Sequence, residues 1–472
     1  MASRATTAEA SERVDIAFIA MIVAVATIGG FMFGYDSGVI NGTQDGLERA
    51  FGLSKLGTGL NVGAILIGCA IGAFAAGTLA DRIGRRSVMM IAAVLFVGSA
   101  VGAGAAGSSA MFILARIVGG LGVGAASVIS PVYISEVTPA RIRGRLSSVQ
   151  QIMIIAGLTG AFVANYALAR SAGGSTAELW GGYPAWRWMF WLQVAPAVVY
   201  LVALLAIPES PRFLMLQGRE VAALNVLTRL FGADAARAKA AEIKISLQLD
   251  HRPRLSDLRL PGGGLRPIVW TGIGLAVFQQ LVGINVVFYY GAALWQSVGF
   301  SEDDALRINI LSGALSILAC LFAIAAIDRV GRRPLLLAGS LAMAVTLAVI
   351  AACFSTARYS DDALSLGDTA GTTALIAANL YVVAFNASWG PVMWVMLGEM
   401  FPNQLRGSAL AVAGFAQWIA NFTISVSFPA LAVGVGLPLV YGFYATAAFL
   451  SFFFVRIMVV ETRGRELEEM RG

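Results

Sequence analysis

The sequence predicts an all-α membrane protein of twelve transmembrane helices, arranged as two related six-helix halves. Composition is the first reason, because 58% of the residues are hydrophobic and 13% are charged, whereas a soluble domain carries about 25% charged residues. The second reason is that the apolar residues form runs long enough to cross a bilayer, which takes about 20 residues in a helix. The third is that the same charged motifs occur twice, in the same order, between these runs.

Six apolar runs make up the first half. The predicted spans are 16–38, 60–80, 88–107, 112–134, 146–168 and 187–207. The first run lacks the small-residue cleavage site of a signal peptide and contains Asp36, so we expect it to be retained as a helix. Glycines inside the runs favour closely packed transmembrane helices.

A polar segment, residues 208–266, joins the two halves. It contains a helical stretch from Glu220 to about Leu249 and then Pro261 followed by three glycines, which predict a break before the next span. The segment is too short and too polar for a catalytic domain, so we expect short helices on the cytoplasmic face. The chain therefore divides into an N-terminal bundle (1–207), a linker (208–266) and a C-terminal bundle (267–472).

The second half repeats the pattern of the first. Its predicted spans are 267–292, 308–327, 335–353, 375–397, 408–430 and 436–459. The sequence DRIGRR that begins at Asp81 returns as DRVGRR at Asp328, and Glu136 with Arg143 returns at the same spacing as Glu399 with Arg406. Membrane proteins built from two related halves commonly hold a binding site between them, and this favours a transporter.

The basic residues alternate from loop to loop. One side of the predicted membrane holds the arginines of the repeated motifs and the central segment, and the other holds a sparse set mixed with acidic residues. The positive-inside rule places the arginine-rich side and both termini in the cytoplasm. The net charge of +6 thus reflects membrane topology and does not indicate a nucleic-acid partner.

We predict no cofactor, no metal site and no enzymatic activity. The single histidine, His251, has no neighbouring ligands with which to bind a metal. No glycine-rich phosphate loop with Lys-Ser/Thr is present, which disfavours a nucleotide-driven pump. Cys69, Cys320 and Cys353 all fall within predicted spans, so we expect no disulfide.

Asp36 and Arg116 are the most informative charges within the predicted spans. A charged side chain inside the membrane is costly and usually marks a functional site. The alternative is that the first span ends at Asp36, which would place this carboxylate at the membrane surface.

Taken together, these motifs resemble the sugar porter family of the major facilitator superfamily, over nearly the whole chain from Gly34 to Gly464. The motifs that carry the resemblance are Gly77 to Arg86, Arg116 with Gly119 to Gly124, Pro208 to Arg212, Gln279 to Tyr290, and Trp389-Gly390-Pro391. The chain is similar to bacterial proton-coupled sugar symporters of the D-xylose/proton type, and more distantly to the glucose facilitators of animals.

The resemblance implies that Asp36 and Arg116 face each other inside the first half. Asp36 would then accept the coupling proton, since passive facilitators of the family carry a neutral residue in its place. We expect protonation of Asp36 to release Arg116 and to permit the inward-facing state.

The resemblance also implies a network of charges that ties the two halves together at the cytoplasmic side when the transporter is open outward. In the first half it comprises Asp81, Arg82, Arg85, Glu136, Arg143, Glu209 and Arg212. In the second half it comprises Asp328, Arg329, Arg332, Glu399, Arg406, Glu461 and Arg463. The alternative is that the arginines only anchor the topology.

A sugar site is predicted from polar and aromatic residues within apolar helices. Sugar hydroxyls need donors and acceptors together, which amide side chains supply without charge, and the apolar faces of a sugar ring suit aromatic contact. The family motif maps onto Gln151, Gln279, Gln280, Asn285, Trp394, Gln417 and Trp418. Phe33 is a candidate wall, and Tyr289 and Tyr290 resemble the outer gate. The alternative for any one glutamine is a hydrogen bond between helices.

Two positions depart from the xylose symporters of the family. Leu158 stands where they carry a glutamine, and Ser316 stands where relatives carry an asparagine. Both changes shorten the hydrogen-bonding reach of the side chain, and sites of this kind discriminate strongly between hydroxyl patterns. A hexose, a pentose and a cyclic polyol therefore remain open as substrates.

The expected function is import of a monosaccharide by alternating access, coupled to a proton. The alternatives are a facilitator without proton coupling and a proton-coupled transporter of a cyclic polyol such as inositol. A membrane sugar sensor is disfavoured, because about a dozen residues follow the last span. We expect a functional monomer in the bacterial inner membrane, whose partners are the sugar, the proton and the lipid bilayer.

Overall fold

The computed structural model describes residues 15–249, 255–260, 262–360 and 363–463. Twelve segments of this part of the chain are helices long and apolar enough to cross a membrane. The predicted number of spans is thus confirmed, and the chain is a multi-pass membrane protein.

The helices of the first half follow one another with short connections. They are α1 (Ile16–Val39), η1 (Ile40–Gly42), α2 (Gln44–Phe51), α3 (Lys55–Ile83), α4 (Arg85–Ala105), α5 (Ser109–Val137), α6 (Ala140–Ala172), α7 (Ala185–Leu192) and α8 (Val194–Leu204). A small hairpin of β1 (Glu178–Trp180) and β2 (Tyr183–Pro184) precedes α7.

Short helices connect the halves: α9 (Pro211–Leu216), α10 (Glu220–Phe231), α11 (Ala233–Leu249) and η2 (Leu255–Leu258). The second half consists of α12 (Pro267–Leu281), α13 (Ile284–Ser297), α14 (Glu302–Val330), α15 (Arg332–Ser355), α16 (Asp368–Asn386), α17 (Trp389–Met400), α18 (Asn403–Gly434) and α19 (Leu437–Met458). A second hairpin pairs β3 (Arg358–Ser360) with β4 (Ala363–Ser365).

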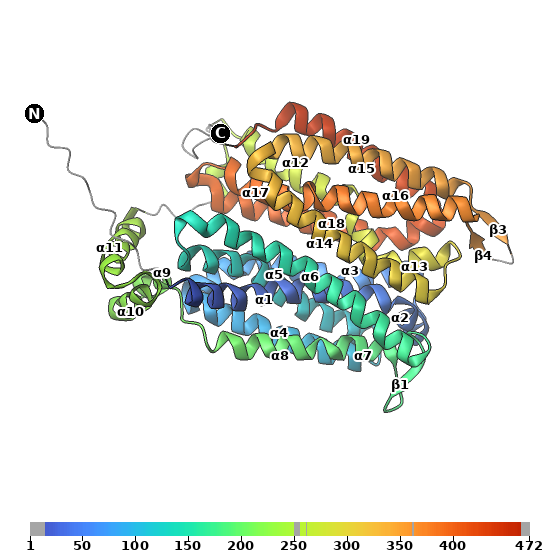
Figure 1. The fold of residues 1–472 in the computed structure, drawn as a ribbon, viewed down its shortest axis with the longest axis horizontal. Coiled ribbons are helices and arrows are strands. Elements are labelled where there is room, and N and C mark those ends of the chain that lie inside the picture. Colours follow the sequence, from blue (N-terminus) through green and yellow to red (C-terminus); the bar gives the residue numbers. More distant parts are fainter. Residues whose placement is uncertain (1–14, 250–254, 261, 361–362, 464–472) are drawn as a thin grey trace, which may run out of the picture.

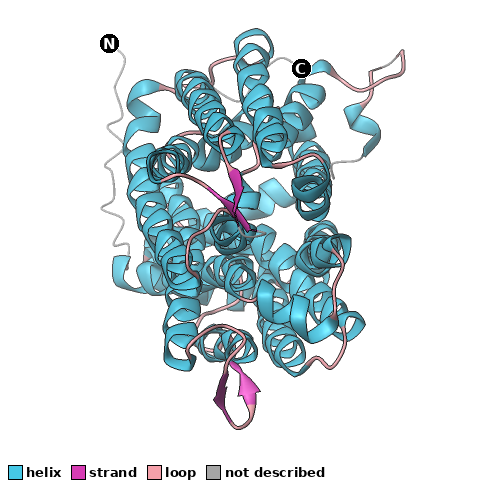
Figure 2. Ribbon diagram, turned by 90° about the vertical axis from the view of Figure 1, so that its right-hand side faces the viewer, coloured by secondary structure: helices cyan, strands magenta, loops and turns pink. Residues whose placement is uncertain are grey.

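The two halves lie side by side with their helices roughly parallel (Figure 1). Helices α9, α10 and α11 lie at one end of the bundle, and the two hairpins lie at the other, which faces the viewer in Figure 2. We call the first the basic end, because Arg85 and Arg332 lie there, and the second the far end. The main helix contacts between the halves are α3 with α18 and α6 with α14.

The sequence repeat is also a structural repeat. Helices α3 and α14 each have 29 residues, and each begins after a serine, Ser54 or Ser301, whose hydroxyl accepts a backbone N–H of the first turn. Each ends at a glycine, Gly84 or Gly331, with φ near +100°. Glycine adopts this backbone conformation readily, so the next helix starts at the following residue.

Two spans that the sequence predicts as continuous are broken in the structure. The seventh consists of α12 and α13, separated by Gly283 at φ +80°, and the tenth consists of α16 and α17. Each broken segment, Pro267–Ser297 or Asp368–Met400, is still apolar enough as a whole to count as one span, so hydropathy does not reveal the breaks. The hydroxyl of Tyr381 donates to the Val282 carbonyl at the first break, 2.7 Å away, which satisfies a backbone group that the interrupted helix leaves open.

Most predicted span boundaries differ from the observed helix ends by a few residues. The sixth span ends at Leu204 and not at 207. The predicted linker helix is two helices, α10 and α11, because Gly232 adopts φ +83° between them.

Candidate functional site

Asp36 and Arg116 meet inside the first half. Asp36 lies on α1 and Arg116 on α5, and their side chains are 0% and 1% exposed. Nη1 of Arg116 binds Oδ1 of Asp36, and Nη2 donates to the backbone carbonyl of Asp36 at 3.0 Å. Helix α1 continues past Asp36 to Val39, so the first helix does not end at Asp36, and the carboxylate is buried among the helices.

The pair does not use all of its hydrogen-bonding atoms. Oδ2 of Asp36 and Nε of Arg116 have no hydrogen-bond partner among the described residues, and neither does the nearby hydroxyl of Ser99. A Cβ atom placed on Gly119 would lie 3.1 Å from Asp36 Oδ2 and 2.4 Å from Ser99 Oγ, so Gly119 keeps this side of the carboxylate open. Buried polar atoms without partners are uncommon and call for an explanation, and the predicted role of Asp36 as the proton acceptor would provide one.

The break in the seventh span positions three of the predicted sugar ligands. Gln279 and Gln280 lie in the last turn of α12, and Asn285 lies in the first turn of α13. The left-handed turn at Gly283 brings the amide of Asn285 back to Gln280, where Nδ2 donates to Oε1 at 2.6 Å.

A chain of amide side chains extends from this break. Nε2 of Gln280 donates to Oε1 of Gln279 at 3.1 Å, and Nε2 of Gln417 on α18 donates to the same oxygen at 3.0 Å. Nε2 of Gln279 donates to the Trp389 carbonyl at the start of α17, 3.1 Å away. Four predicted ligands, Gln279, Gln280, Asn285 and Gln417, therefore form one uncharged group of donors and acceptors.

Aromatic side chains lie beside the amide chain. The rings of Phe33 on α1 and Trp418 on α18 are 5.9 Å apart, so this contact joins the two halves. Tyr289 is 4% exposed. The hydroxyl of Tyr290 donates to the Ser425 carbonyl at 2.7 Å, which ties it to α18 within its own half. The gate role of both tyrosines stays a prediction.

Gln151 and Trp394 are not joined to this group. Gln151 is half-buried and Trp394 is 40% exposed, and neither side chain has a hydrogen bond or ring contact with the part of the chain that the structure describes. Their roles as ligands also stay predictions.

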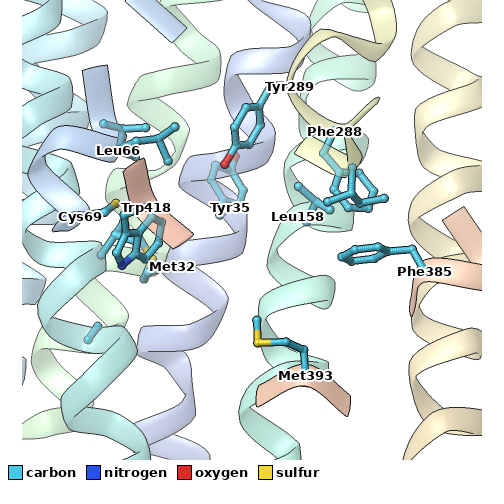
Figure 3. Close-up of a cluster of buried hydrophobic side chains, with 14 of the residues drawn as sticks. Met32, Tyr35, Leu66, Cys69, Leu158, Phe288, Tyr289, Phe385, Met393 and Trp418 are labelled. Atoms are coloured by element: carbon cyan, nitrogen blue, oxygen red, sulfur yellow. The ribbon is translucent and has the colours of Figure 1, made fainter. Parts of the chain in front are cut away.

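The two positions that depart from the xylose symporters have different surroundings. Leu158 belongs with Phe288, Phe385 and Met393 to a cluster of buried apolar side chains (Figure 3). Ser316 donates to the Ser312 carbonyl and accepts from Nδ2 of Asn386 on α16, at 3.2 Å. A neighbouring helix thus supplies an amide next to Ser316, which sequence reasoning missed. The available signal was Asn386 itself, a polar residue within an apolar run.

The charged motif of the first half forms a compact cluster at the basic end. Arg85 donates twice to the carboxylate of Glu136, with both distances 3.1 Å, and pairs with Asp81 at 3.1 Å. The side chains of Arg85 and Glu136 are 8% and 9% exposed. Glu209 accepts the backbone N–H groups of Arg85 and Arg86 and so caps α4.

The second half repeats this cluster group by group. Arg332 binds Glu399 at 3.0 and 2.9 Å and pairs with Asp328 at 3.0 Å. Glu461 accepts the backbone N–H groups of Arg332 and Arg333 and so caps α15. Burial raises the pKa of Glu461, but the backbone N–H groups of Arg463, Arg332 and Arg333 outweigh burial, so the pKa lies below its usual value.

The remaining residues of the predicted network are placed less centrally. Arg212 donates to Ser246 at 3.3 Å, Arg406 to the Phe401 carbonyl at 3.5 Å and Arg463 to the Arg329 carbonyl at 2.6 Å. The side chains of Arg82 and Arg329 are exposed, and the side chain of Arg143 lies outside the described part of the structure. The contacts named here join elements within one half or the segment that follows it, so a tie between the halves at this end stays a prediction.

The chain matches the family model described as "Sugar (and other) transporter" over residues 22–472. It is 48% identical over 457 residues to a glucose transport protein of Synechocystis, with 97% of each chain covered. It is 38% identical to the D-xylose-proton symporter of Escherichia coli K12, covering 96% of this chain and 95% of the relative.

Two solved structures have the same fold. The inward open conformation of the E. coli xylose transporter XylE matches with a TM-score of 0.81 at 36% identity, covering 96% of this chain and 99% of that one. XylE bound to 6-bromo-6-deoxy-D-glucose matches with a TM-score of 0.77 at 37% identity, with 96% and 98% covered.

The chain belongs to the sugar porter family of the major facilitator superfamily.

This sugar porter thus has the twelve-helix fold that its sequence predicts. Its family is one of transporters, and both the buried ion pair and the amide chain lie within the helices that cross the membrane.

Proposed function

We propose that the protein imports a monosaccharide by alternating access, driven by the symport of a proton. The observation that carries this proposal is the chain of amides from Asn285 to Gln417 inside an apolar bundle. It offers donors and acceptors without net charge, which suits a neutral polyhydroxylated ligand and disfavours an ion. The relatives named above, a glucose transport protein and a xylose-proton symporter, support the same class of substrate.

Proton coupling is assigned to Asp36 and Arg116. A carboxylate that is 0% exposed and has one oxygen without a described partner is a suitable proton acceptor. The ion pair is formed in a structure whose halves are also hydrogen-bonded to each other at the far end, where Asn41 binds backbone groups of α13. An intact pair in this arrangement fits a step after the proton has left Asp36. The release of Arg116 would then belong to the protonated protein.

We assign the basic end to the cytoplasm, because the arginine-rich clusters lie there. On this orientation both termini are cytoplasmic and the protein lies in a bacterial inner membrane as a functional monomer. Residues 1–207 and 267–472 would be the two moving bundles, with 208–266 as the joint on the cytoplasmic face.

Uptake into proteoliposomes tests the proposal. Labelled glucose, xylose, arabinose and myo-inositol are supplied with and without an inward proton gradient. Accumulation of one sugar above equilibrium only with the gradient supports symport. Equilibration that ignores the gradient would identify a facilitator, and accumulation of myo-inositol alone would identify a polyol transporter.

A further inference from the structure

The far end of the bundle holds a polar contact between the halves, centred on Asn41 in η1. Nδ2 of Asn41 donates to the Phe288 carbonyl at 2.8 Å, and Oδ1 accepts from the Ala292 backbone N–H at 3.0 Å. The same oxygen accepts from Nδ2 of Asn309 on α14 at 2.7 Å. Asn41 is 1% exposed, so all three hydrogen bonds are shielded from water.

The two backbone groups that Asn41 binds are one helical turn apart. In an α-helix the carbonyl of Phe288 and the N–H of Ala292 are hydrogen-bond partners of each other. The carboxamide of Asn41 therefore bridges one rung of the α13 hydrogen-bond ladder from the opposite half. Nε2 of Gln44 binds the next carbonyl, that of Tyr289, so two successive carbonyls of α13 are held from the first half.

The backbone of α13 is shaped for this close approach. A Cβ atom placed on Gly291 would lie 2.5 Å from Oδ1 of Asn309 and 3.1 Å from Nδ2 of Asn41. The first distance is too short for any side chain, so glycine at this position lets Asn41 and Asn309 reach each other across the helix.

Helix α13 also carries Asn285, Tyr289 and Tyr290, the predicted ligand and gate residues. The bonds of Asn41 exist only while α13 lies against the end of α1. Opening the far end by even a few ångströms would break all of them together, since hydrogen bonds weaken steeply beyond about 3.5 Å.

We propose that Asn41 is a positioning residue for transport, a latch that holds α13 in place while the far end is closed and that must release in each cycle. The inference rests on the proposed alternating-access function. A ligand contact is not required of Asn41, because its carboxamide is already engaged by backbone and side-chain groups of the other half.

Two pairs of spin labels test the latch in the full-length protein in lipid nanodiscs, with Cys69, Cys320 and Cys353 replaced. One pair, Ala50→Cys on α2 and Val433→Cys on α18, reports on the far end, and both positions are exposed. The other pair, Ile83→Cys and Val330→Cys, lies at the ends of α3 and α14 at the basic end. Pulsed dipolar spectroscopy gives the distance distribution for each pair.

Asn41→Ala should lengthen the far-end distances and shorten the basic-end distances. We expect the ratio of far-end-open to far-end-closed protein to rise about tenfold, which corresponds to about 1.4 kcal/mol, since a buried hydrogen bond contributes about this much. Asn309→Ala removes only one of the three contacts and should shift the ratio in the same direction by less. It keeps the inference testable if Asn41→Ala does not fold.

Asn61→Ala is the matched control. Asn61 is also 1% exposed, but its amide donates to the Gly57 carbonyl and Ser109 Oγ within the first half, so neither distance distribution should move. Unchanged far-end distances in both latch variants would overturn the inference, as would both label pairs broadening in the same direction, which signals general loosening. Sugar uptake by the parent protein is measured in parallel. If the variants shift the distances but the parent moves none of the sugars, the transport proposal fails, and what remains of the inference is that Asn41 holds the far end closed.

Discussion

Replacing Asp36 by asparagine is the sharpest test of proton coupling, because it removes the ionisable group and keeps the shape. Arg116 is 1% exposed, and its two terminal nitrogens bind the carboxylate and the backbone carbonyl of Asp36. Removing one partner of a buried pair destabilises a protein by about 3–5 kcal/mol. Asparagine at position 36 keeps an Oδ1 acceptor and the backbone carbonyl for Arg116. We therefore expect the variant to lose about 3 kcal/mol of stability, the lower end of this range.

The effect on transport follows from the proton gradient. One pH unit across the membrane corresponds to about 1.4 kcal/mol, which supports up to about a tenfold sugar gradient for one proton per sugar. We expect the parent protein to approach this ratio and Asp36→Asn to stop at a ratio of about one. Exchange of labelled for unlabelled sugar should persist in the variant, because it needs no net proton movement.

The assay is uptake into proteoliposomes with an imposed pH gradient, followed by counterflow without one. Asp303→Asn is the matched control, because Asp303 pairs with Arg307 at 2.7 Å but both side chains are about half exposed. Such surface pairs contribute about 0–1 kcal/mol, so this variant should accumulate sugar like the parent. Gradient-driven accumulation by Asp36→Asn would refute the coupling role. Loss of both accumulation and counterflow in a folded variant would make Asp36 structural.

Three further predictions follow from the amide chain, the apolar cluster and the α15 cap. Gln280→Ala should weaken sugar binding about tenfold by titration calorimetry, since hydrogen bonds contribute about 1 kcal/mol each and Gln280 links two other amides; unchanged affinity would remove it from the site. Leu158→Gln should shift the ratio of xylose to glucose uptake toward xylose by up to about tenfold, and an unaltered ratio would show that Leu158 does not face the sugar. The lowered pKa of Glu461 means that its stabilising effect is present above the ordinary value of 4.5 and is lost as the pH falls through the lower folded pKa. Parent and Glu461→Gln should therefore differ in melting temperature by a constant amount above about pH 5 and converge below it; a difference that grows in acid would contradict the assignment.

The charged motifs show how far a repeat in the sequence predicts structure. DRIGRR and DRVGRR predict equivalent turns, and the structure gives each the same glycine conformation and the same arginine–glutamate pair. The sequence does not indicate that Glu209 and Glu461 bind backbone N–H groups at helix starts. From sequence alone, a carboxylate near an arginine is interpreted as the partner of an ion pair.

The sequence by itself determined the number of spans, the two halves and the presence of charges within the membrane, because hydropathy and motif order are properties of short stretches of chain. The contact of Asp36 with Arg116 was predicted, but through the family resemblance and not from hydropathy. Tertiary structure alone decided which other side chains meet. The convergence of Gln417 on Gln279 and the contact of Asn41 with α13 depend on how each helix is rotated and how far it is shifted along its neighbours. Those rotations and shifts are set by packing over the whole bundle. The two broken spans change the helix directions again, and hydropathy does not reveal them because each broken segment is apolar enough as a whole to count as one span.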